Sequence, residues 1–233
     1  YGIGAGRQRL VLVADFGGGT LDLALVRIDA RNMESGQCEV VSKEGRKVGG
    51  NDIDHWIVQR FCDVSGYPNM RDSEDEKKQF WYNMLLAEGR RVKEGVFFNP
   101  EESFTMVPPE DFRKFEARLH GEAGAMDFTR NMLIDIMREH DLYGTLKSCL
   151  NGIERQMHEQ KLGFDDVSDV LMVGGSTLLP GIYDVFQEKF GRDRVGRGPY
   201  EGCPRINCAA EIRVVVKSYT TDQLPVLRQL PLV

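Results

Sequence analysis

One short turn between two apolar segments constrains this sequence more than any other feature. It reads VADFGGGTLDLALV from Val13 to Val26, so three glycines follow an apolar run and an aspartate. The run from Leu10 to Ala14 is continuously apolar, which is typical of a strand buried on both faces. The segment from Leu21 to Ile28 is also rich in strand formers. The pattern predicts two strands joined by a glycine-rich turn, with a third short strand over Cys38 to Ser42.

This turn has the composition of a phosphate site beside a metal ion. Glycine lets backbone N–H groups approach an anion closely, because no Cβ stands in the way. A carboxylate next to a phosphate is repulsive unless a cation lies between them, so Asp15 and Asp22 indicate a Mg²⁺ whose waters they hold. The candidate phosphate contacts are Gly17, Gly18, Gly19 and Thr20. The alternative is a tight hairpin without a ligand, although two-residue turns suffice for hairpins.

A second glycine turn follows a later apolar strand, expected over Val167 to Val173. A nucleotide's sugar or α-phosphate would be able to approach Gly174 and Gly175 closely. Strand-to-helix loops often carry glycine, so this turn alone also fits a loop without a ligand. Pro180 is expected in the first turn of the following helix, which Gly191 ends.

Further helices are expected from periodicity and end signals. Asn51 opens one that ends at Gly66, and the S-x-x-E pattern beginning at Ser73 predicts a capping box for the next. That second helix is expected to end before Gly95. Two more are expected over Phe128 to Arg138 and Leu142 to Gln160. A small subdomain with a weak sheet is expected over Val96 to Met126, and it would include a short helix over Asp111 to Leu119.

Composition argues against several classes of protein. The chain has 233 residues and a net charge of -6, which gives no case for a nucleic-acid-binding surface. No apolar run approaches the roughly 20 residues of a membrane helix. The 5 cysteines have unrelated spacings, which predicts reduced and mostly buried thiols in a cytoplasmic protein.

Five segments resemble, in matching order, the actin-like ATPase superfamily and most closely its seventy-kilodalton heat-shock (DnaK-like) chaperones. They are DFGGGTLD (Asp15–Asp22), VGGNDIDHWIVQRF (Val48–Phe61), AEGRRVKE (Ala87–Glu94), YGTLKSCLNGIE (Tyr143–Glu154) and VSDVLMVGGSTLLPGIYDVFQEKFG (Val167–Gly191). The resemblance covers about Tyr1 to Gly191. It implies an α/β fold, an actin-like ATPase (ribonuclease H-like) lobe with a smaller inserted α+β subdomain. The lobe core would comprise residues 1–64 and 128–233, and the insertion residues 65–127.

The resemblance also implies roles for individual residues, with ATP or ADP and Mg²⁺ as cofactors. The first glycine turn would contact the β- and γ-phosphates. Asp15 would hold Mg²⁺ through water and help order the attacking water, and Asp22 matches a second catalytic carboxylate. Glu88 and Arg91 would hydrogen-bond the ribose and stack near the base, and they share one helix face. The alternative for that pair is a solvated ion pair. Gly174 and Gly175 match the turn on the adenosine side.

The chain departs from the family pattern at three places. Leu178 stands where a basic residue usually packs on the adenine, so it would either contact the base or face Ile182 in the core. Asn51 replaces an acidic residue. From Cys203 onward the sequence no longer follows the pattern that begins at Pro199.

The resemblance implies the second nucleotide-binding lobe only, since nothing before Tyr1 matches the first. The chain would then be a fragment, an ATPase only where the first lobe is present. The expected partners are that missing lobe, co-chaperones and client proteins. Two alternatives stay open: an actin-like cytoskeletal or cell-division protein, which would polymerise with ATP, and a regulatory module that binds a partner but no nucleotide.

Overall fold

The computed structural model describes residues 8–29, 39–67, 70–106 and 125–197. Its main sheet has five strands in the order β3-β2-β1-β6-β7. Their bounds are β1 (Gln8–Phe16), β2 (Leu21–Asp29), β3 (Glu39–Arg46), β6 (Asp169–Val173) and β7 (Val195–Arg197). β1 runs antiparallel to β2 and parallel to β6. The predicted strand–turn–strand arrangement is confirmed, and the sheet with its helices agrees with the expected α/β class.

At the end of β1, apolar side chains and a carboxylate take opposite faces of the sheet. Side chains alternate between the two faces of a strand. Ala14 and Phe16 therefore share a face, and both belong to the buried core beneath the helices. Asp15 takes the opposite face at the end of the strand. Its direct partner across the β1–β2 pair is Asp22, so the two carboxylates lie on the same face of the sheet.

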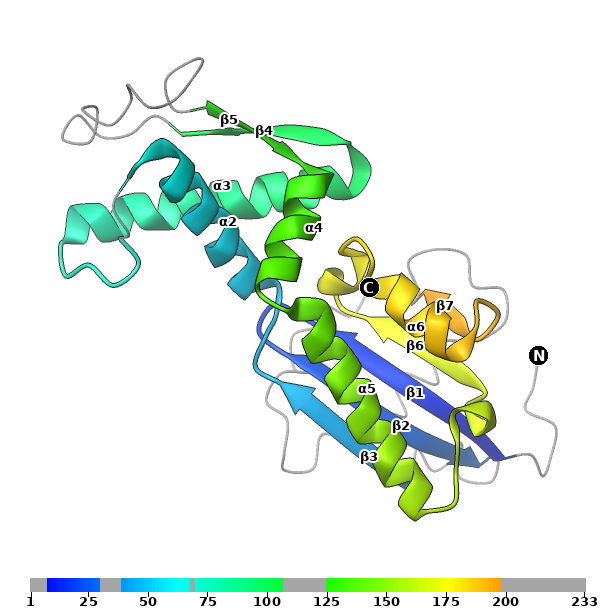
Figure 1. Cartoon of the computed structure of the whole chain (residues 1–233). Coiled ribbons are helices and arrows are strands. Elements are labelled where there is room, and N and C mark those ends of the chain that lie inside the picture. The colour runs from blue at the N-terminus through cyan, green and yellow to red at the C-terminus, as the bar shows by residue number, and fades with distance from the viewer. Residues whose placement is uncertain (1–7, 30–38, 68–69, 107–124, 198–233) are drawn as a thin grey trace.

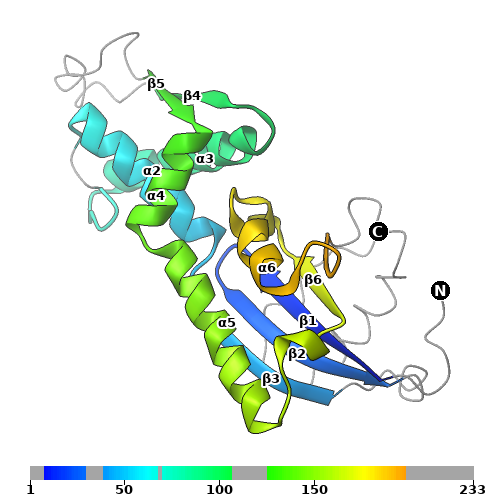
Figure 2. The same cartoon turned by 45° about the vertical axis from the view of Figure 1, so that its right-hand side comes forward.

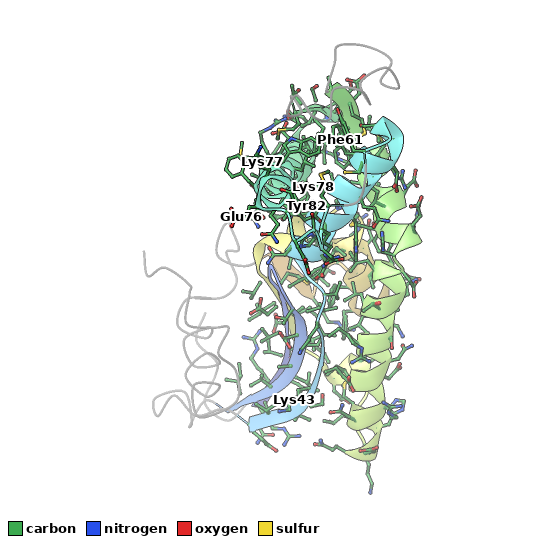
Figure 3. The ribbon with its side chains drawn as sticks, turned by 90° about the vertical axis from the view of Figure 1, so that its left-hand side faces the viewer. Lys43, Phe61, Glu76, Lys77, Lys78 and Tyr82 are labelled. Carbon is green, nitrogen blue, oxygen red and sulfur yellow. The ribbon has the colours of Figure 1, made fainter. Side chains whose placement is uncertain are left out.

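Two helices cover one face of this sheet, α5 (Leu142–Glu159) and α6 (Ile182–Phe190) (Figure 1). Figure 3 shows the sheet nearly edge-on, with β3 at the front and α5 along one side. The Gln156 side chain donates to the Lys43 carbonyl at 3.1 Å, and the Gln160 side chain donates to the Val41 carbonyl at 2.8 Å. These bonds satisfy backbone acceptors of the edge strand β3, which would otherwise face solvent.

A second group of elements lies beyond one end of the main sheet (Figures 1 and 2). It contains α2 (Gly50–Ser65), α3 (Glu76–Phe98), the hairpin β4 (Glu101–Thr105) and β5 (Ala125–Thr129), and α4 (Arg130–Glu139). Phe61 stacks on Phe104 with 4.3 Å between ring centroids, which joins α2 to the hairpin. Tyr82 lies on the side of α3 toward α2, whereas Lys77 points away from it (Figure 3). A small second sheet was predicted here and is confirmed; the limits of the inserted subdomain stay a prediction.

The predicted cap of α3 is wrong by two residues. The Asp75 carboxylate accepts from the Lys77 amide at 2.9 Å and from the Lys78 amide at 3.4 Å, so Asp75 is the N-cap. Asp75 outcompetes Ser73 because an ionised carboxylate is the stronger acceptor for exposed helix amides. The helix also continues past Gly95 to Phe98. The bare Cα of Gly95 gives room to the side chain of Glu102 in β4, so this glycine serves packing and does not end the helix.

Two other boundaries differ from the sequence prediction. Phe128 lies in β5, and α4 begins only after Thr129, whose hydroxyl accepts from the Met132 amide at 3.2 Å. Pro180 precedes α6, whose N-cap is Gly181. Cys62 and Cys149 are free and buried as expected. The other three cysteines, the proposed helix over residues 111–119 and the divergent tail lie outside the described residues.

No helix in the described segments combines the length and the apolar character that a membrane span requires.

Candidate functional site

The glycines of the first turn are not needed by the fold itself. The Gly17 amide donates to the Thr20 carbonyl at 3.0 Å and closes the turn. None of Gly17, Gly18 and Gly19 has a positive φ. A Cβ on Gly19 would meet nothing within 4 Å, and one on Gly18 would meet the flexible end of Asn51 at 3.2 Å. Internal strain and packing therefore leave the glycine run unexplained, which points to close approach by a ligand.

The carbonyl groups of this turn are fixed by the N-terminus of α2. The Gly50 amide donates to the Gly17 carbonyl at 3.0 Å, and the Asn51 amide donates to the Gly18 carbonyl at 2.7 Å. In a trans peptide the C=O and the following N–H point in opposite directions. The amides of Gly18 and Gly19 therefore point away from α2, and within the described residues neither has an acceptor. Two outward N–H groups on adjacent residues form a concave donor site for an anion.

The second turn docks directly on the first. β6 ends beside β1, and a one-turn 3₁₀ helix, η3 (Gly175–Leu178), follows. Gly174 has φ 90°. A Cβ there would collide with the Phe16 carbonyl and lie 3.0 Å from the Asp15 carboxylate. Close approach of the two strand ends thus explains Gly174, whereas a Cβ on Gly175 would meet nothing within 4 Å. The Ser176 hydroxyl donates to the Gly17 carbonyl at 2.8 Å and links both turns.

The paired carboxylates have the chemistry of a cation site. Burial, and then the charge of Asp22, raises the pKa of the Asp15 carboxyl to about 6. The Asp22 carboxylate lies over Gly45 of β3, where a Cβ would come within 2.6 Å of its oxygen. Mg²⁺ typically takes one or two carboxylates and completes its shell with water and phosphate oxygens. These two residues fit that pattern; no group of three or more metal-binding side chains occurs among the described residues.

α3 presents two cations toward the N-terminus of α2. The Lys93 ammonium lies 2.6 Å from an Asp54 carboxylate oxygen and donates to the Gly50 carbonyl at 2.9 Å. Arg90 contacts the other Asp54 oxygen at 3.2 Å and donates to the Asn51 side chain at 3.2 Å. Gly50 and Asn51 are the residues whose amides hold the carbonyls of the first glycine turn. The ion pair therefore supports the turn from behind.

Glu88 and Arg91 lie on a different face of α3, toward the β4 hairpin. The two side chains form a paired contact at 2.9 and 2.8 Å, and Glu88 also accepts from the Thr105 amide at 2.9 Å. Arg91 in turn contacts Glu102 at 3.0 Å. Burial alone would raise the pKa of the Glu88 carboxyl, but the bonds from Arg91 and Thr105 hold it below its usual range. The ribose role of Glu88 and Arg91 stays a prediction. The Glu88 carboxylate accepts three bonds here, which leaves one of its roughly four acceptor positions for a ribose hydroxyl.

Leu178 is a surface residue. Its exposed fraction is 48%, so it does not belong to the core beside Ile182. It ends η3, the turn that begins with Gly175. The structure thus excludes the core interpretation of Leu178 and leaves its contact with a base as a prediction.

Comparison with known proteins agrees with this arrangement. The model of the family described as Hsp70 protein matches residues 1–197. The chain belongs to the Hsp70 family. Membership supports the predicted resemblance and is consistent with the mixed sheet and helices described above.

Similar Hsp70-family proteins are chaperones by name. The chain is 26% identical over 233 residues to the chaperone protein HscA homolog of Pseudoalteromonas atlantica, covering 100% of this chain and 33% of that protein. It is 25% identical over 210 residues to the chaperone protein DnaK of Endomicrobium trichonymphae, covering 89% of this chain and 30% of that protein. The chain thus spans about a third of the length of these curated relatives.

Sequence reasoning assigned no role to three residues of this Hsp70-family site: Lys93, Asp54 and Ser176. Lys93 adjoins the apolar stripe of α3 at Val92, and that position at the margin of the buried face was the available signal. Asp54 lies among the apolar residues of α2, where a carboxylate is rare unless it is paired. For Ser176 no local signal distinguishes a structural hydroxyl from a ligand contact.

Proposed function

We propose that this chain binds ADP or ATP with Mg²⁺ as the second lobe of an Hsp70-type ATPase clamp. One observation carries the proposal. Neither packing nor backbone strain within the chain requires the glycine run of the first turn, and hydrogen bonds from α2 to the carbonyls of this turn leave its amides pointing outward. Such a turn can accept terminal phosphates between Gly17 and Thr20. The second turn, at Gly174 and Gly175, would take the nucleoside side.

Asp15 and Asp22 are the residues that would hold the Mg²⁺. The bound ion would offset the charge of the phosphates and of the two carboxylates. Asp15 is the candidate to orient an attacking water, since its oxygen lies close to Gly174 and to the first turn. Phosphoryl transfer depends mainly on such positioning and electrostatics.

Catalysis by this chain alone is expected to be poor. In the proposed clamp the other wall of the site comes from the first lobe, and contacts from that wall go uncompensated when it is absent. The first lobe, co-chaperones and client proteins are therefore the partners we propose for the longer protein. A cytoplasmic location stays a prediction.

Titration of the chain with ADP, in Mg²⁺ and in EDTA, tests the proposal. Calorimetry, or amide spectra of the ¹⁵N-labelled chain, should show tighter binding in Mg²⁺. Gly19→Val should abolish binding without changing the melting temperature, because its side chain enters open space. Equal affinities with and without Mg²⁺ would contradict the metal role of the carboxylates. Unchanged binding by Gly19→Val would contradict the phosphate role of the turn.

A further inference from the structure

The Gly17 carbonyl is held from two directions. The Gly50 amide reaches it from α2 at 3.0 Å, and the Ser176 hydroxyl reaches it from the second turn at 2.8 Å. A carbonyl oxygen has two lone pairs, so both of its acceptor positions are used. Ser176 itself is 8% exposed and sits in a 3₁₀ turn closed by the bond from the Thr177 amide to the Gly174 carbonyl at 3.1 Å. Its position is therefore set by the second turn.

A glycine run needs such a restraint. Glycine has more accessible backbone conformations than any other residue, so the peptide between Gly17 and Gly18 can rotate unless both of its sides are fixed. One bond to the carbonyl defines its direction loosely, whereas two bonds from different elements fix the peptide plane. The N–H of that same peptide belongs to Gly18 and points opposite to the carbonyl.

We propose that Ser176 is a positioning residue of the phosphate turn, whose hydroxyl fixes the Gly17–Gly18 peptide so that the Gly18 amide faces the terminal phosphates of a nucleoside diphosphate. The inference rests on the proposed nucleotide binding. Ser176 acts through the peptide and not through the nucleoside. Its removal should weaken ligands that carry a diphosphate and spare adenosine.

The experiment compares Ser176→Ala with Ser168→Ala in the ¹⁵N-labelled chain. Ser168 is a matched control, because its hydroxyl contacts the Leu10 amide at 3.4 Å where β6 begins, at the opposite end of that strand. Each protein is titrated with Mg²⁺–ADP, Mg²⁺–pyrophosphate and adenosine. For Ser176→Ala we expect affinity for the first two ligands to fall about tenfold, which is roughly 1.4 kcal/mol. Adenosine affinity should change less than about twofold, and Ser168→Ala should match the unmodified chain with all three ligands.

Ser176→Cys provides a second variant with a weaker donor of similar size. Its affinity for Mg²⁺–ADP and Mg²⁺–pyrophosphate should lie between that of the unmodified chain and that of Ser176→Ala. Equal weakening of adenosine and pyrophosphate by Ser176→Ala would overturn the inference, because it would mean direct contact with the nucleoside. Unchanged pyrophosphate affinity in both Ser176 variants would overturn it too. The unmodified chain is titrated first. If it binds neither ADP nor pyrophosphate, the proposed function itself fails.

Discussion

The Lys93 ammonium lies 2.6 Å from the Asp54 carboxylate, and both side chains are buried between α2 and α3. The two partners are not equivalent. Asp54 has a second cation, Arg90, at 3.2 Å, whereas the one further polar contact of Lys93 within the described segments is the Gly50 carbonyl. Removing one partner of a buried ion pair is costly because it leaves an uncompensated charge.

Asp54→Ala is therefore expected to destabilise the chain more than Lys93→Met does. The first change should lower the free energy of unfolding by about 3–5 kcal/mol, since it strands the Lys93 ammonium. The second should cost about 1–2 kcal/mol, because Arg90 still compensates the carboxylate and methionine replaces the buried stem. Urea unfolding at neutral pH measures both values. The reverse order would mean that Arg90 does not compensate Asp54.

Gly174 and Gly175 provide a matched pair of substitutions. Gly174→Ala should destabilise the chain by more than about 2 kcal/mol, because φ is 90° and the added Cβ meets the Phe16 carbonyl. Gly175→Ala places its methyl in open space and should stay within about 0.5 kcal/mol of the unmodified chain. Thermal unfolding compares the two, and equal effects would show that Gly174 does not lie in close contact with the Phe16 carbonyl.

Asp15→Asn should make the ligand-free chain more stable at pH 7.5. The folded pKa of Asp15 is about 6, above the ordinary 3.8. The folded state therefore binds the proton more tightly, and the stability that this provides is present below about pH 4 and is lost as the pH rises through 6. Asparagine avoids the charged buried state, so we expect a gain of about 1–2 kcal/mol at pH 7.5 that vanishes near pH 4. Denaturant titrations in EDTA across this range measure it, and a gain independent of pH would refute the assignment.

Glu88→Gln tests the ribose role that the family resemblance predicts. If Glu88 accepts from ribose hydroxyls, loss of its charge should weaken ADP by about fivefold, since hydrogen bonds to charged groups are the stronger ones. Pyrophosphate lacks the ribose and should bind unchanged. Calorimetry with both ligands gives the answer. Equal ADP affinity in the two proteins would leave Glu88 as a structural partner of Arg91 and the Thr105 amide.

Leu178→Arg tests whether this surface position contacts a base. Leucine offers no charge to stack on an adenine, so ADP and GDP should differ by no more than about tenfold, or 1.4 kcal/mol, in the unmodified chain. Arginine should tighten ADP more than GDP. Because Leu178 is exposed, stability should change by less than about 0.5 kcal/mol. If Leu178→Arg changes neither the ADP affinity nor the GDP affinity, Leu178 lies away from the base.

The sequence by itself determined the features that depend on near neighbours. Continuous apolar runs predicted β1 and β6, and periodic apolar residues predicted α2 and α5, since alternation and helical spacing are local properties. The two glycine turns, the carboxylate pair Asp15 and Asp22 beside the first of them, and the family were also predicted. The start of α3 was predicted two residues too early, because Ser73 and Asp75 both offer an oxygen to backbone amides at this end of the helix.

The tertiary structure alone decided which of these groups meet. Ser176 and Gly17 are 159 residues apart, and they hydrogen-bond only because β1 and β6 pair in parallel and end together. The partners of the two faces of α3 depended likewise on long-range packing, which pairs Lys93 with Asp54 of α2 and Glu88 with the Thr105 amide of the hairpin. Sequence spacing defines which residues share a helix face, but long-range packing decides what that face contacts.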